Sequence, residues 1–154
     1  MKHLALFIIY FPIFSLSLFA QVKISTGSSL IDVQVKRAFA QGDDVCIDLM
    51  LTSHTKWDMI SLHACEVYDD EGNHYQLMGV SFQVSDEMID VMVDGKRRCI
   101  FSVAKDIPRK VRVIIRNVDE YASAFSLVKI EWWGDRSSAN IINTTIKDLQ
   151  ITRE

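Results

Sequence analysis

The stretch Cys65-Glu66-Val67-Tyr68-Asp69-Asp70-Glu71-Gly72-Asn73-His74-Tyr75-Gln76-Leu77 decides the fold class, because two strand-like runs meet in it across a turn. The turn is the segment from Asp69 to Asn73, in which glycine tolerates a positive φ and Asp and Asn hydrogen-bond their own backbone. The β-branched and aromatic residues on both sides favour extended chain. The stretch therefore predicts a β-hairpin with a loop of about three to five residues.

Outward from this hairpin, apolar residues alternate with polar ones, which is the period of a half-buried strand. Ile31, Val33 and Val35 show the pattern first. Turn signals recur about every 8–14 residues, as expected for a sandwich of short strands. The sequence therefore predicts an all-β antiparallel β-sandwich of seven to eight strands. The expected strands lie at 31–36, 45–52, 57–68, 74–82, 88–93, 99–103, 111–116 and 125–132.

Three segments depart from simple alternation. The phase breaks between Leu62 and Cys65, where a β-bulge would restore the inward direction. Residues 85–98 fit a short strand or one turn of amphipathic helix, and a strand followed by a turn at 94–95 is the preferred interpretation. The tail 146–151 is predicted to add a final strand to the same sheet, and the alternative is that it pairs with the sheet edge of another molecule.

The hairpin also carries a resemblance. Val67-Tyr68-Asp69-Asp70-Glu71-Gly72-Asn73-His74-Tyr75, followed by a run of short strands, resembles the hairpin of immunoglobulin-like β-sandwich domains of unknown function in exported proteins of Bacteroidetes and other bacteria. The likeness extends over about residues 31–130. It implies a fold and a location outside the cytoplasm. It brings no activity and therefore no functional residue.

The N-terminal residues 1–20 are typical of a signal peptide. Lys2 and His3 precede an apolar run, and Ala20 ends it, so that Gln21 is the expected first residue after cleavage. A retained anchor helix is the alternative that the length permits. We expect residues 21–30 to form a flexible N-terminal segment and residues 31–154 to form a single β-sandwich domain, periplasmic or extracellular, with no membrane span after cleavage.

The charge balance argues against nucleic-acid binding. Without residues 1–20 the chain has 16 Lys and Arg against 20 Asp and Glu, a net charge of −4. Nucleic-acid binding requires a clustered basic face. The charge of the longest basic run, 96–98, is balanced by acidic residues at 86, 87, 90 and 94, so the run is interpreted as a solvated hairpin tip.

Three cysteines, Cys46, Cys65 and Cys99, leave at least one thiol unpaired. Buried free thiols are the preferred interpretation. If a disulfide forms, the expected pairing is Cys65 with Cys99, because alternation directs both side chains to the core. The cysteines lack the close spacing of a metal site, so no metal ligand is predicted.

No segment has the pattern of a catalytic site. His54, His63 and His74 lie in or near strands, and no serine stands in a Gly-x-Ser-x-Gly elbow. The acidic turn lacks calcium-loop spacing, because the twelfth position counted from Asp69 is Val80. We therefore expect a protein that is not an enzyme and that needs no cofactor.

The tryptophans Trp57, Trp132 and Trp133 are the candidate contacts for a ligand or partner. Neighbouring residues of a strand point to opposite faces, so Trp132 and Trp133 cannot both lie in the core. The sequence predicts a non-catalytic exported binding or interaction module with an unknown protein or glycan partner. The alternatives are a structural subunit of a cell-surface assembly that uses the C-terminal strand, and a carbohydrate-binding module that uses an exposed tryptophan.

Overall fold

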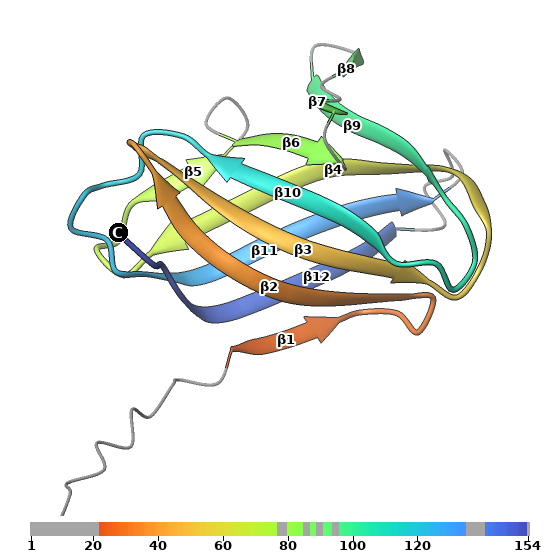
Figure 1. The fold of residues 1–154 in the computed structure, drawn as a ribbon, viewed down its shortest axis with the longest axis horizontal. Helices are drawn as coiled ribbons and strands as arrows, with labels where there is room; N and C mark the ends of the chain where they lie inside the picture. The colour runs from red at the N-terminus through yellow and green to blue at the C-terminus, as the bar shows by residue number, and fades with distance from the viewer. Residues whose placement is uncertain are drawn as a thin grey trace, which may run out of the picture.

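The computed structural model describes residues 22–76, 80–84, 87–88, 91–93, 96–134 and 141–153. These residues form two antiparallel sheets that lie face to face (Figure 1). No helix occurs among them, and thus none that is long and apolar enough to span a membrane. The all-β antiparallel sandwich expected from the sequence is confirmed. The expected signal peptide, residues 1–20, lies outside the described residues.

The described residues form twelve strands in the two layers, more than the seven to eight that the sequence predicted. One sheet has the order β1-β12-β11-β4-β9-β8, with β5 also paired to β4, and the other has the order β2-β3-β10-β6-β7. Their bounds are β1 Lys23–Thr26, β2 Ile31–Gln41, β3 Asp44–Ser53, β4 Trp57–Asp69, β5 His74–Gln76, β6 Val80–Val84, β7 Glu87–Met88, β8 Val91–Val93, β9 Lys96–Val103, β10 Arg109–Ile115, β11 Ala124–Gly134 and β12 Ile141–Gln150.

The core lies between the two sheets and is built by the alternation that the sequence shows. Along β10, Val111, Val113 and Ile115 are buried, whereas the residues between them are half-buried. In the facing sheet, Val128, Ile130 and Trp132 of β11 are buried in the same way. Removal of this apolar surface from water is the main favourable contribution to folding.

A β-bulge keeps β4 in phase with its neighbour. Trp132 of β11 lies opposite Leu62, whereas the adjacent Glu131 lies opposite Ala64, so His63 is the extra residue. The extra residue restores the inward direction, and both Leu62 and Cys65 are buried. The bulge expected between Leu62 and Cys65 is therefore confirmed.

Two expectations about individual strands were wrong. The segment 21–30 contains strand β1, which pairs with β12 from Lys23 opposite Lys147 to Thr26 opposite Thr144. Residues 74–82 do not form one strand, because β5 belongs to the seven-stranded sheet and β6 to the five-stranded sheet. β1 is mostly exposed and lacks the alternation on which the prediction relied, and a change of sheet between β5 and β6 leaves no mark on the alternation.

The C-terminal segment forms a strand of the chain's own sheet, as predicted. β12 lies between β11 and β1 and is hydrogen-bonded to both (Figure 1). Neither edge of β12 is therefore open to a strand of another molecule in this structure. In the segment 85–98, β7 and β8 are strands, and β8 pairs with β9 on either side of residues 94–95, which are not described.

Candidate binding surfaces

The three tryptophans have different environments. Trp57 and Trp132 are buried, with exposed fractions of 4% and 0%, and Trp133 is half-buried on the outer face of the seven-stranded sheet. The indole Nε1 of Trp132 donates to Thr144 Oγ1 at 3.0 Å inside the core. The expected division between Trp132 and Trp133 is thus observed. Trp57 and Trp132 are core residues.

Trp133 lies in an apolar part of the outer face of the seven-stranded sheet. Ile141 of β12 is directly opposite Trp133 and is 41% exposed, and Ser61 of β4 is opposite on the other side. The indole Nε1 of Trp133 donates to the carboxylate of Glu131, which stands on the same face. Trp133 and Ile141 together form what we call the Trp133 patch.

The other end of this outer face carries a pair of stacked aromatic rings. The rings of Tyr68 and His74 stack with their centroids 4.2 Å apart. The Tyr68 hydroxyl donates to Glu66 at 2.9 Å, and Lys129 lies 3.4 Å from the other carboxylate oxygen of Glu66. The hydrogen bond from Tyr68 is the main reason that the pKa of Glu66 lies below its usual value.

The outer face of the five-stranded sheet contains a buried carboxylate between two arginines. The side chain of Asp48 on β3 is 5% exposed. Its carboxylate accepts hydrogen bonds from Arg37 Nε at 2.8 Å and from Arg112 Nε at 2.6 Å. Burial by itself would raise the pKa of Asp48, but the hydrogen bonds from Arg112 and Arg37 outweigh it and hold the pKa below the usual value. Asp48 is therefore ionised and fixes both guanidinium groups.

Phe39 lies beneath the same arginines. The guanidinium carbon of Arg37 is 4.4 Å from the centroid of the Phe39 ring, and that of Arg112 is 5.4 Å away. Such cation–π contacts restrict the guanidinium planes. Farther along the face, Arg116 Nε donates to the buried Ser81 Oγ at 3.1 Å. These residues are called the arginine cluster: Arg37, Asp48, Arg112 and Arg116.

The acidic turn of the hairpin is a structural element. Asp69 is 3% exposed, and its carboxylate accepts from the backbone N–H groups of Glu71 and Asn73, from Asn73 Nδ2 and from the Tyr75 hydroxyl. Asp70 accepts from the backbone and hydroxyl of Ser123 and from the backbone of Ala124. Both carboxylates satisfy the donors of their own chain, which explains the residue choice in this turn.

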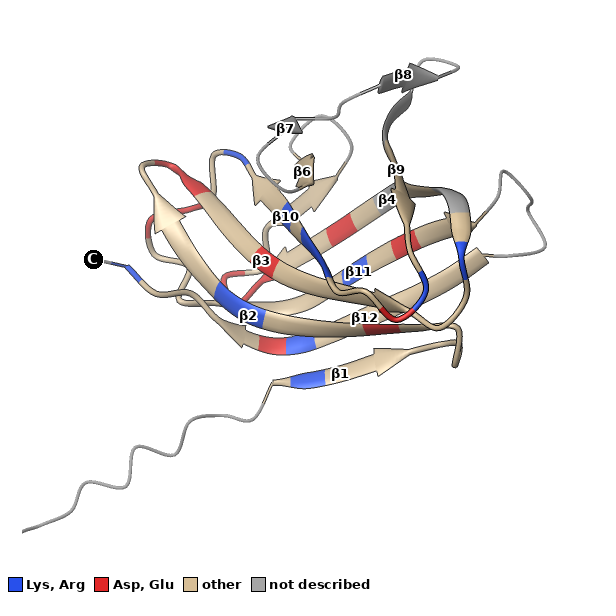
Figure 2. Ribbon diagram, turned by 45° about the vertical axis from the view of Figure 1, so that its right-hand side comes forward, with Lys and Arg blue, Asp and Glu red and all other residues tan. Residues whose placement is uncertain are grey.

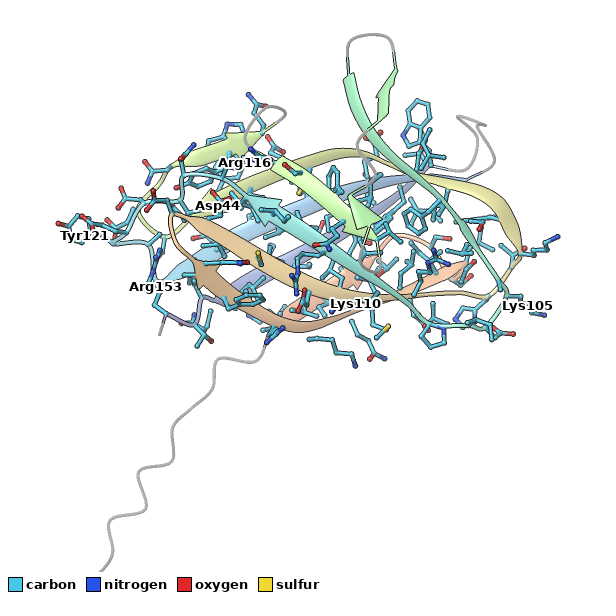
Figure 3. The ribbon with its side chains drawn as sticks, turned by 45° about the horizontal axis from the view of Figure 1, so that its top comes forward. Asp44, Lys105, Lys110, Arg116, Tyr121 and Arg153 are labelled. Atoms are coloured by element: carbon cyan, nitrogen blue, oxygen red, sulfur yellow. The ribbon has the colours of Figure 1, made fainter. Side chains whose placement is uncertain are left out.

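His54 joins three segments at the end of the sandwich that also carries Lys105 (Figure 3). Its Nδ1 lies 3.0 Å from Asp106 Oδ1, and its Nε2 lies 2.9 Å from Asp32 Oδ2. The hydrogen bonds to Asp106 and Asp32 raise the pKa of His54. Because both ring nitrogens face carboxylates, the doubly protonated ring is the form that fits this position.

The cysteines do not form the disulfide that the sequence left open. Cys46 and Cys65 are buried free thiols. Cys99 lies opposite Leu62 in the pairing of β4 with β9, three residues from Cys65 along β4. Three residues of strand correspond to roughly 10 Å, beyond the Cα separation that a disulfide tolerates. Alternation placed both residues on the core side but could not give their register.

No group of three or more His, Cys, Asp or Glu placed to hold a metal ion occurs among the described residues. His54 and His74 make the structural contacts given above. The arginine cluster was not predicted from the sequence. Its signal is present, however, because Asp48 and Arg112 stand at outward positions of two predicted strands that are rich in apolar residues. The pairing of those strands, which joins the charges, requires the fold.

No protein-family model matches the chain, and no curated protein matches it. Among solved structures, the chain is similar to the reeler domain of human F-spondin (fragment 1), with 11% sequence identity and a TM-score of 0.36. The similarity covers 83% of this chain and 84% of that domain.

Proposed function

We propose that this protein is an exported, non-catalytic binding module that contacts its partner through the Trp133 patch. The observation that carries the proposal is the orientation of Trp133, which faces outward while Trp57 and Trp132 lie in the core. Export is supported by the sequence of residues 1–20, which is typical of a signal peptide.

The patch has the chemistry of a contact point. Tryptophan offers a large apolar area at low conformational cost and concentrates at interaction hot spots. Ile141 extends that area across to β12, since it is 41% exposed and directly opposite Trp133. The carboxylate of Glu131 accepts a hydrogen bond from the indole N–H of Trp133 and thereby holds the ring in one orientation. A ring that is oriented before binding loses less freedom when a partner arrives.

The polar clusters support a non-catalytic role. Catalysis by a nucleophile requires a base within reach of it and a third group that orients the base. His54 instead links Asp32 of β2 to Asp106 of the loop between β9 and β10, and Asp69 is enclosed by donors of its own turn. These groups hold the loops together and are not directed at a common reacting atom.

Carbohydrate binding is the second candidate function, and it uses the same residue. A half-buried indole on a sheet face can stack on the apolar face of a sugar ring. The polar side chains of Glu131 and Asn143 lie on the same face next to it and could accept or donate hydrogen bonds to hydroxyl groups. If the partner is a glycan, its binding should therefore change the environment of the Trp133 indole directly.

Tryptophan fluorescence of the chain 21–154 tests this function. The wild type and the variants Trp133→Phe and Lys147→Ala are titrated with soluble β-glucan, xylan and mannan. We expect a spectral change with at least one of them that is lost in Trp133→Phe and kept in Lys147→Ala, because Lys147 is an exposed residue far along the same sheet. A change that persists in Trp133→Phe would exclude the patch. Turnover of an ester, glycoside or peptide would exclude a non-catalytic role.

A further inference from the structure

The outer face of the five-stranded sheet concentrates positive charge on a chain whose net charge is −3. Figure 2 shows Lys and Arg on β2 and β10 on both sides of the acidic position on β3. Arg37 comes from β2, Lys110 and Arg112 come from β10, and Arg116 directly follows the end of β10. In Figure 3, Lys110 and Arg116 lie toward opposite ends of β10, and Asp44 lies near Arg116 at the end of the face.

Asp48 organises this charge but does not cancel it. Its carboxylate is 5% exposed and lies beneath the arginines, whereas the side chain of Arg37 is 60% exposed. Arg37 contacts Asp48 through Nε. Because a guanidinium group has five N–H donors, a second anion can bind its outer edge while the inner edge stays on Asp48. Arg116 likewise uses Nε for Ser81 and is exposed.

Lys110, Arg112 and Arg116 form a line along β10 and the residue that follows it, with Arg37 beside them on β2. Same-face residues of a strand repeat at about 7 Å, so Lys110 and Arg112 stand about 7 Å apart and Arg112 and Arg116 about 13 Å apart. A ligand with regularly repeated anionic groups matches such a line. Phe39 beneath the guanidinium groups keeps their planes fixed, which lowers the conformational cost of binding.

We propose that the arginine cluster, with Lys110, binds an acidic polysaccharide through its carboxylate or sulfate groups. The strands at the centre of this face, β3 and β10, are paired on both edges. A peptide therefore cannot add to them as a further strand and would keep only side-chain contacts while losing its own flexibility. A stiff polysaccharide requires only side-chain contacts.

This surface lies on the sheet opposite to the one that carries Trp133, so the two sites can be tested separately. The probes are polygalacturonate, which offers carboxylates, and heparin, which offers sulfates. Titration calorimetry on the chain 21–154 measures binding at low salt and at about 0.15 M salt, where exposed charges are partly screened. We expect binding of at least one probe that weakens as salt increases.

The double variant Arg37→Gln/Arg116→Gln removes two exposed positive charges and leaves Arg112 on Asp48. The matched control, Lys23→Gln/Lys147→Gln, removes two exposed positive charges from the other sheet. We expect the first variant to weaken binding about tenfold or more, the change that corresponds to one charge-assisted contact, and the control to change it less than about twofold. Lys110→Gln, which does not touch Asp48, should also weaken binding if the double variant proves unstable.

Three results would overturn the proposal: no binding of either polysaccharide at low salt, equal losses in the variant and its control, or equally tight binding of poly-glutamate, which would indicate an acidic peptide. Trp133→Phe separates this site from the Trp133 patch. We expect that variant to keep its affinity for the acidic polysaccharides, whether or not it loses the fluorescence response to the neutral glycans.

Discussion

The hydroxyl of Tyr75 donates a hydrogen bond to Asp69 Oδ2 at 2.7 Å, and the same hydroxyl oxygen accepts a hydrogen bond from the backbone N–H of Asp119 at 3.2 Å. The hairpin between β4 and β5 is thereby fastened to the loop between β10 and β11. Burial alone would raise the pKa of Asp69, but the hydrogen bonds from Asn73 and Tyr75 hold it below its usual value of 3.8. The ionised carboxylate thus belongs to the folded state.

Asp69→Ala should destabilise the protein by about 2–4 kcal/mol, because several donors around a buried carboxylate lose their acceptor. Tyr75→Phe should lower the free energy of unfolding by about 1 kcal/mol, because it removes the hydrogen bond from the hydroxyl to Asp69. The contribution of Asp69 is present above pH 3.8 and is lost as the pH falls through the lowered folded-state pKa. Urea unfolding of the wild type and Asp69→Ala between pH 3 and 7 measures both effects, and a difference that grows toward low pH would contradict them.

His54 should make the stability depend on pH with the opposite sign. Its folded-state pKa is raised above 6.5 by Asp106 and Asp32, so its contribution is complete below pH 6.5 and is lost as the pH rises through the folded-state value. An NMR titration of the His54 ring should give a pKa above 6.5. The pKa should be lower in Asp106→Asn and in Asp32→Asn than in the wild type. A titration at 6.5 that neither variant changes would exclude the link.

Gly134→Ala should disturb the packing around Trp57. A Cβ at position 134 would lie 3.0 Å from Trp57 Cε2, and the buried indole has little room to move. We expect a loss of about 1–3 kcal/mol in the free energy of unfolding. Gly27→Ala is the control, because its nearest neighbour, Asn143 O, would be at 3.4 Å. Equal stability of Gly134→Ala and the wild type would show that the indole can shift.

Thr144→Val should leave the indole N–H of Trp132 without its acceptor in the core. The shape of the side chain is conserved, so the expected cost of about 1–3 kcal/mol comes from the unpaired donor. Thr145→Val changes the neighbouring residue of the same strand, which faces outward, and should have little effect. Thermal unfolding of the two variants distinguishes them, and similar losses would indicate a general effect on β12.

The thiol of Cys65 should be almost unreactive in the folded protein. Burial raises its pKa to about 12, and burial also raises the pKa of Cys46. The thiolate is the reactive form, so alkylation by iodoacetamide at pH 8 should modify neither residue until denaturant is added. Mass spectrometry detects the label at each position. A Cys65–Cys99 bridge in the purified protein would contradict the register of β4 and β9.

The alternation of apolar residues was sufficient to predict the sandwich, because the long strands each have one face in a shared core. It also located a bulge between Leu62 and Cys65, since those two residues could not otherwise both point inward; the pairing with β11 identifies His63 as the extra residue. The same signal failed for Lys23–Thr26, which is mostly exposed and is held by backbone hydrogen bonds to β12. It also failed at 74–82, where the chain changes sheets.

The candidate sites show the same limit. Strand period alone required one of Trp132 and Trp133 to face outward, and the structure identifies Trp133. The arginine cluster depends on pairing between strands that are distant in sequence, since Arg112 on β10 reaches Asp48 on β3. Local pattern cannot give such register, and it could not place Cys65 relative to Cys99 for the same reason.

The position of β1 against β12 has a consequence for how the chain reaches its native state. The seven-stranded sheet pairs the first described strand with the last one, so the sheet cannot be completed before the C-terminal segment is present. Pairing over such sequence separation makes folding slow. We expect the seven-stranded sheet to stay incomplete during synthesis until β12 is available to pair with β1.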